Sequence, residues 1–303
     1  MKKNAVKTIS TKKEIFSKKW NDILEEIALF RRESMSNWIW FRGHSKEEYK
    51  LDSGLFRTLD KNKKLKLMQY IILEDHLKIN FKQQASTFIR EDDIDLQFHM
   101  QHHGLKTRLL DWTDSFGTAL YFAFEGWDYD KENNACIWLL DPYALHCNLQ
   151  EEYPTIKTTD SIRNMNEKLV KGKIESLSDI FNNEHMEYTF PMYPSKNNAR
   201  LLVQNGYFTV QSNRLEDLEV ELEQACPENK EKILKKIILS PDLLECIYEY
   251  LTLNGINHFT VYNDVDALSK YLNKELTENA FDEKIKRIAK FSSLNYIENN
   301  MDI

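Results

Sequence analysis

Six consecutive apolar residues at 135–140, Ala-Cys-Ile-Trp-Leu-Leu, constrain the fold of this chain more than any other feature. The run is too short for a typical globular helix, and Asp141 and Pro142 end it. Such a run is typical of a central strand. An aromatic run at 38–41, Trp-Ile-Trp-Phe, lies between Asn37 and Gly43 and predicts a second buried strand. A buried sheet is therefore expected in the core.

Helical periodicity dominates much of the remaining chain. Apolar residues at helical spacing predict helices at 12–34, 63–90 (one long helix or two joined ones), 93–103, 113–127, 160–182, 241–254 and 264–273. Thr113 or Asp114 is expected to cap the helix at 113–127, and Gly255 is expected to end the helix at 241–254. The charged segment 215–236, interrupted by Pro227, predicts a helical hairpin with a solvated outer face.

Further strands are expected at 237–239, at 259–262 and within 200–211. The last segment predicts two short strands around Asn205 and Gly206, or one strand with a bulge there. The sequence has no internal repeat and no low-complexity linker, which favours one integrated α+β domain with helical additions. We expect a basic lead at 1–19, the domain at 20–275 and a peripheral tail at 276–303.

Composition excludes several classes of protein. With 303 residues, 42% of them hydrophobic, the chain can bury a sizeable core and is too apolar to be disordered. Its four cysteines are too far apart for a Cys-x-x-Cys zinc or redox motif, so we expect reduced thiols. No stretch approaches the roughly 20 apolar residues of a membrane span or the apolar run of a signal peptide, so a cytoplasmic protein without membrane contact is expected. The net charge of −7 argues against a broad basic surface for duplex nucleic acid.

Arg42 is the first candidate binding residue. It ends the aromatic strand and is followed by Gly43, which permits close approach of a ligand or of another backbone. A guanidinium is always charged and binds phosphate oxygens in a forked geometry, so Arg42 predicts an anion site. The alternative is an internal salt bridge to an acidic residue.

The densest polar cluster lies at 101–113, in the segment QHHGLKTRLLDWT. Adjacent histidines His102 and His103, together with Thr107, Arg108 and Asp111 before a helix, can bind a phosphate and transfer a proton. Asp111 is expected to pair with Arg108 or to orient a histidine, and a buried Arg108–Asp111 ion pair that only holds the loop is the alternative. Adjacent histidines seldom chelate one ion, so no metal site is expected.

A third constellation is Arg200 with Gln204, which a strand would place on one face, so that both could line one pocket. In the alternative reading, Gln204 only satisfies a backbone group. The motifs Gly-x-Ser-x-Gly and Gly-x-Gly-x-x-Gly and the phosphate-binding P-loop are all missing from the sequence. With eight glycines in the whole chain, a glycine-rich phosphate loop is excluded.

These motifs together resemble the FRG domain family over about residues 20 to 275. The residues that carry the resemblance are Trp40-Phe41-Arg42-Gly43, Leu51-x-x-Gly54-Leu55-Phe56-Arg57, the run at 101–113, Ala119-Leu120-Tyr121-Phe122-Ala123, Arg200-x-x-x-Gln204-x-Gly206-x-Phe208-Thr209 and Leu253-x-x-Gly255-Ile256. Lys106 stands where the family usually has proline, and the charged segment near 213–236 is longer than usual.

The order of these elements is, more distantly, similar to the ADP-ribosyltransferase fold, several members of which are bacterial toxins or phage-defence effectors. The similarity implies a mixed, split central sheet and NAD as substrate. Arg42 and Gly43 would hold its pyrophosphate, with Thr107, Arg108 and Arg200 lining the diphosphate and adenosine side. His102 or His103 would position the ribose or relay a proton, and Gln204 would touch the ribose hydroxyls.

The usual enzyme of that kind has a glutamate on the late strand, where this chain has Gln204. Either Asp111 or Glu74 supplies the carboxylate, or the transfer differs, or the site only binds. Two functions stay open: an ADP-ribosyltransferase acting as a toxin or defence effector on nucleic acid or protein, and a non-catalytic nucleotide- or RNA-binding module. An antitoxin or sensor subunit is a further expected partner, with 213–236 and the tail as docking places.

Overall fold

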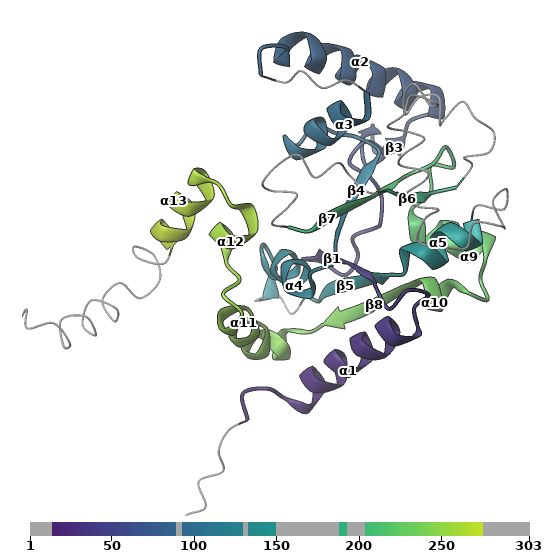
Figure 1. The fold of residues 1–303 in the computed structure, drawn as a ribbon. Coiled ribbons are helices and arrows are strands. Elements are labelled where there is room, and N and C mark those ends of the chain that lie inside the picture. The colour runs from purple at the N-terminus through teal and green to yellow at the C-terminus, as the bar shows by residue number, and fades with distance from the viewer. Residues whose placement is uncertain (1–13, 89–92, 130–132, 150–187, 193–203, 275–303) are drawn as a thin grey trace, which may run out of the picture.

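The fold is seen in a computed structural model, which describes residues 14–88, 93–129, 133–149, 188–192 and 204–274 (Figure 1). Its centre is a six-stranded sheet in the order β6-β7-β4-β1-β5-β8. The strands are β1 (Trp40–His44), β4 (Leu109–Thr113), β5 (Ala135–Leu140), β6 (Phe190–Met192), β7 (Gly206–Val210) and β8 (Leu234–Leu239). The α+β class with flanking helices is thereby confirmed. We expected a mixed sheet, and the pairs between these described strands are all antiparallel.

β5 is the predicted central strand, and all six of its residues are buried. Its side chains alternate between two hydrophobic clusters, as the period of two of a strand requires. Ile137 and Leu139 pack with α1 (Lys18–Glu33), α4 (Phe116–Phe124) and α11 (Leu244–Leu253). Trp138 and Leu140 pack on the opposite face with α5 (Pro142–Leu149) and α9 (Leu218–Ala225). The sheet is therefore covered by helices on both faces.

Gly43 is required by the close approach of β1 to α4. A Cβ atom at this position would lie 1.9 Å from the carbonyl oxygen of Ala119 and 2.6 Å from the backbone nitrogen of Ala123. Both neighbours are backbone atoms, which cannot move aside cheaply. The sequence indicated that Gly43 permits close approach of either a ligand or another backbone. In the structure, the neighbour is the backbone of α4.

A small subdomain lies near β4, an inner strand of the sheet (Figure 1). It consists of the hairpin β2 (Leu59–Asp60) and β3 (Lys63–Lys64), then α2 (Leu67–Ala85) and α3 (Asp93–His102). The helix expected at 63–90 begins only at Leu67, because Lys61 and Asn62 have φ values of 47° and 66° and form the hairpin turn. Leu55, Phe56 and Tyr70 form a separate core beneath α2.

Other boundaries also differ from the expectation. The helix expected at 113–127 is α4, and its cap is Ser115, which accepts a hydrogen bond from the backbone of Thr118; β4 occupies the preceding positions and was not predicted. In the charged segment, the hairpin is reduced to α9 and the single turn α10 (Lys230–Ile233), because β8 already begins at Leu234. The helix expected at 160–182 and the tail at 276–303 fall outside the described residues.

The strand expected at 259–262 is wrong. These residues belong to α12 (His258–Tyr262), which is followed by α13 (Val265–Asn273) as expected. Asn257 accepts a hydrogen bond from the backbone of Thr260, whose hydroxyl accepts one from the backbone of Asn257. This capping box overrides the strand propensity of the aromatic and branched residues.

Candidate functional site

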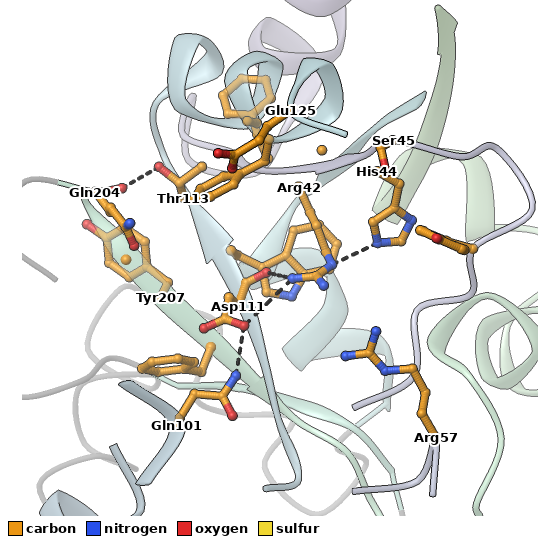
Figure 2. A pocket seen from close by; sticks show the side chains of 18 residues that line it. Arg42, His44, Ser45, Arg57, Gln101, Asp111, Thr113, Glu125, Gln204 and Tyr207 are labelled. Atoms are coloured by element: carbon orange, nitrogen blue, oxygen red, sulfur yellow. Dashed lines mark hydrogen bonds and ion pairs between the residues drawn. The ribbon is translucent and has the colours of Figure 1, made fainter. Parts of the chain in front are cut away.

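A cavity of about 420 Å³ opens where β1 and β4 diverge. The two strands share a single register pair, Phe41 with Thr113, so the sheet separates beyond that point. The wall includes charged and aromatic side chains from four elements and a loop (Figure 2): Arg42 and His44 from β1, Arg57 from the following loop, Asp111 from β4, Phe122 from α4, and Tyr207 and Phe208 from β7. The expected split of the sheet thus coincides with the cavity.

Arg42 spans the gap between the diverging strands. Its Nη1 donates a 2.6 Å hydrogen bond to the backbone carbonyl of Asp111, and its Nε donates a 2.9 Å bond to Nε2 of His44. The side chain of Arg42 is 17% exposed, and burial lowers its pKa to about 10, so it is a cation at neutral pH. Part of the guanidinium is used to hold the strands, which fixes the position of the charge in the cavity.

His44 is held neutral beside Arg42. Burial and, next, the charge of Arg42 lower the pKa of His44 to about 3. Because the guanidinium always carries its protons, Nε2 of His44 must present a lone pair, and the ring proton lies on Nδ1. His44 therefore acts as an acceptor that orients Arg42.

Arg57 contributes a second positive charge. It is exposed and lines the cavity, and its guanidinium has no hydrogen bond or ion pair with any residue in the described part of the chain. Figure 2 shows this guanidinium turned toward Arg42. An unpaired cation beside a fixed cation makes this end of the cavity suited to an anion.

Asp111 and Glu125 are the acidic residues of the wall. The side chain of Asp111 is 57% exposed, lies 3.9 Å from Nη1 of Arg42, and accepts a 2.8 Å hydrogen bond from Gln101. Glu125 follows the last residue of α4 and lies across the cavity from Arg57 (Figure 2). The site therefore has the two guanidiniums with Asp111 beside Arg42 at one end, and the carboxylate of Glu125 at the other.

Comparison with known protein families identifies residues 37–133 as a match to the FRG domain. This chain contains an FRG domain. The resemblance stated from the sequence motifs is thereby confirmed over the matched range, while the wider limits of 20–275 stay a prediction. Comparisons with curated proteins and with solved structures gave no match.

The FRG domain match includes Arg42, Arg57, Asp111 and Glu125, and it ends just before β5. The remaining wall of the cavity, including Tyr207, comes from β7, outside the matched range. The cavity is therefore formed jointly by the FRG match and the C-terminal half of the sheet.

Arg108 and Glu74 do not line the cavity. Nε of Arg108 lies 2.6 Å from Oε2 of Glu74, with the two side chains 1% and 8% exposed. Nη1 of Arg108 also donates a 3.0 Å bond to Asn213. The expected pairing of Asp111 with Arg108 or a histidine is thus wrong: on β4, Asp111 points away from the core that buries Leu110 and Trp112.

Thr107, His102 and His103 also differ from the expected arrangement. Thr107 is fully buried, and its hydroxyl donates a 2.6 Å bond to Gln101, which itself lines the cavity. His102 is the last residue of α3 and His103 follows it, with ring centroids 4.9 Å apart, and neither lines the cavity. Each helical residue turns by about 100°, so His102 faces away from the direction of Gln101. The two histidines that the resemblance assigned to the ribose are therefore not among the residues that line the cavity.

Gln204 does line the cavity, although it precedes β7 in a turn instead of lying on a strand. Asn205, with φ of 47°, completes this turn. Gln204 donates a 3.1 Å bond to the carbonyl of Val261, and its own carbonyl accepts a 2.6 Å bond from Thr113. Arg200 lies outside the described residues.

Several residues of the cavity were missed by sequence reasoning. His44 could have been found, because residues two apart on a strand share a face and Arg42 was already a candidate. Arg57 appears in the family motif but has no local pattern that indicates binding. Glu125 and Tyr207 carry no sequence signal, because their place in the site depends on contacts with distant segments.

Proposed function

We propose that this protein binds NAD in the cavity and transfers its ADP-ribose to a nucleic acid or protein acceptor. The observation that carries the proposal is the unpaired guanidinium of Arg57 beside the fixed guanidinium of Arg42. Two adjacent guanidiniums repel each other, and an anion such as the pyrophosphate of NAD relieves that repulsion.

The rest of the cavity fits the other parts of a dinucleotide. Its volume of about 420 Å³ lies within the usual range for small-molecule sites. Phe122 and Tyr207 offer aromatic surfaces to the ligand rings, and Gln204 offers polar atoms near the ribose hydroxyls. Glu125 and Asp111 supply negative charge for the cationic nicotinamide ribose.

The reaction breaks the bond between the anomeric carbon of the ribose and the nicotinamide nitrogen. The electron pair stays on nitrogen, so nicotinamide leaves as a neutral molecule while positive charge develops on the ribose, as in glycoside cleavage. A lone pair of the acceptor forms the new bond to the anomeric carbon, and the proton of the acceptor passes to solvent. No metal, oxidant or reductant is required.

Consumption of NAD and modification of nucleic acid or protein would make the chain a toxin or phage-defence effector. This role extends the resemblance to ADP-ribosyltransferases, and it implies a partner, an antitoxin or sensor subunit, that restrains the activity. A non-catalytic module that binds a nucleotide or RNA through the same two arginines is the alternative.

The test is nicotinamide release from labelled NAD by the purified protein with cell extract as a source of acceptors. We expect release, transfer of label to an acceptor, and a KM for NAD raised about 10- to 100-fold in Arg57→Gln, since charge-assisted hydrogen bonds contribute about 1.5–3 kcal/mol. Arg31→Gln, which changes an exposed arginine on α1, is the matched control. Binding without release would favour the non-catalytic module, and absence of both would refute the proposal.

A further inference from the structure

Three polar side chains converge on Glu125. Its Oε1 accepts a 3.0 Å hydrogen bond from the hydroxyl of Tyr121, and its Oε2 accepts a 2.9 Å bond from the hydroxyl of Tyr262. Nδ1 of His258 lies 3.1 Å from Oε1 and also 2.9 Å from the hydroxyl of Tyr121. Tyr121 lies one helical turn before Glu125, whereas His258 and Tyr262 are the first and last residues of α12. A short helix more than 130 residues away in sequence thus supplies two of the three side chains.

The position of Glu125 is unfavourable for a carboxylate without such donors. It caps the C-terminus of α4, where the partial charge of the helix dipole is negative. Its side chain is 36% exposed and lines the cavity, so it is not a buried structural ion. A negative charge at such a place is stabilised by the hydrogen bonds from Tyr121 and Tyr262.

The number of lone pairs leaves room for a ligand. A carboxylate has about four acceptor positions, and the hydroxyls of Tyr121 and Tyr262 occupy two of them. Even with Nδ1 of His258 at a third position, one acceptor position is left for a donor in the cavity. Because these contacts restrict rotation of the carboxylate, it is preorganised for that donor.

α12 has further contacts with the same wall. The rings of Tyr262 and Phe122 meet edge to face with centroids 6.0 Å apart, and Gln204 donates to the carbonyl of Val261. Phe122, Gln204 and Glu125 all line the cavity. Three separate contacts therefore connect this helix, which lies outside the FRG match, to the ligand side of the site.

We infer that Glu125 is a catalytic carboxylate that faces the ribose of the donor nucleotide, and that His258 and Tyr262 are positioning residues that fix its orientation. This inference rests on the proposed function. Glu125 accepts a hydrogen bond from a ribose hydroxyl and stabilises the positive charge that develops when nicotinamide leaves with the electron pair. No bond forms to Glu125, and the proton of the acceptor still passes to solvent.

The experiment compares kcat and KM for nicotinamide release with the Kd for NAD from equilibrium dialysis. Glu125→Gln should lower kcat about 100-fold or more, as expected for loss of a preorganised electrostatic group. Tyr262→Phe removes one hydroxyl and keeps the ring against Phe122, so it should lower kcat about 10-fold and change the Kd less than threefold. His258→Gln should act in the same direction. The control is Tyr248→Phe on α11, a phenol that is 60% exposed.

The outcomes separate this inference from the proposed function. If wild type releases nicotinamide and the Glu125 and Tyr262 variants keep its kcat, the inference is overturned and the function stands. If wild type releases none, both fail. If Tyr262→Phe lowers the melting temperature but keeps the kcat of wild type at temperatures where the variant is folded, the hydrogen bond from Tyr262 to Glu125 is only structural. The positioning role of Tyr262 is then refuted.

Discussion

The buried pair of Arg108 and Glu74 gives a sharp test of the structure, because both residues were expected in the binding site. Arg108→Met keeps the length of the side chain but removes the 2.6 Å contact to Glu74 and the 3.0 Å bond to Asn213. Glu74 is then left as a charge whose side chain is 8% exposed. Loss of one partner of a buried pair costs about 3–5 kcal/mol, so the free energy of unfolding should fall by that amount.

The pair is best measured by a double-mutant cycle followed by urea unfolding. Glu74→Leu should destabilise the protein as strongly as Arg108→Met. The loss of unfolding free energy in the double variant should be about 2–4 kcal/mol smaller than the sum of the two single losses, since neither charge remains buried. Asp242→Asn, which removes an exposed ion pair with Lys19, should cost less than about 1 kcal/mol.

Two results would refute this reasoning. Additive single changes would show that the two charges do not interact as the geometry requires. If Arg108→Met kept the stability of wild type but lost its affinity for NAD, Arg108 would have to be assigned to the binding site. We expect its Kd for NAD to match that of wild type below the melting temperature.

Two further predictions concern β1. In wild type, the pKa of His44 is about 3 when folded and near 6.5 when unfolded, so the unfolded state takes up the proton first and stability falls as the pH drops below about 6.5. Between pH 8 and pH 5, this effect lowers the free energy of unfolding of wild type by about 2 kcal/mol. Urea unfolding of His44→Asn at both pH values should show a decrease that is smaller by that amount. A His44→Asn protein with the same pH dependence as wild type would contradict the prediction. Gly43→Ala should lower the melting temperature by several degrees or prevent folding, because its Cβ would lie 1.9 Å from a backbone oxygen of α4. Gly54→Ala, whose nearest neighbour would be 3.7 Å away, is the control in the same thermal scan, and equal melting of both variants would be evidence against the close packing.

Local sequence patterns were sufficient to predict the elements whose structure is determined by residues close in sequence. The strand at 135–140 was predicted at its full extent, because six apolar residues ended by Asp141 and Pro142 admit few other structures. The helix predicted at 264–273 is α13, which begins at Val265 because Asp264 caps it through a side-chain hydrogen bond. At 259–262 the strand propensity was misleading, because the cap at Asn257 decides the conformation and was not considered.

The site was predictable only where the candidate residues belong to one strand or one motif. Arg42 was identified from its position after an aromatic strand and before a glycine, and the structure places it in the cavity. The partners of Arg108 are 34 and 105 residues away, so no local rule could distinguish Glu74 from Asp111 as its counter-ion. The same holds for Glu125, whose contacts in α12, His258 and Tyr262, are 133 and 137 residues away.

No helix in the described part of the chain is long and apolar enough to cross a membrane. The same part contains no group of three or more His, Cys, Asp or Glu residues arranged to hold a metal ion. The charged groups that line the cavity between β1 and β4 are guanidiniums and carboxylates.

The central claim is that Arg57 and Arg42 form the anion-binding end of a nucleotide site. Its most direct test is the Kd for NAD of wild type, Arg57→Gln and Arg31→Gln, measured by calorimetry at one fixed salt concentration. The account predicts measurable binding by wild type, an unchanged Kd for Arg31→Gln, and a Kd about 10- to 100-fold higher for Arg57→Gln. Equal affinity of all three proteins, or no binding by wild type, would contradict it.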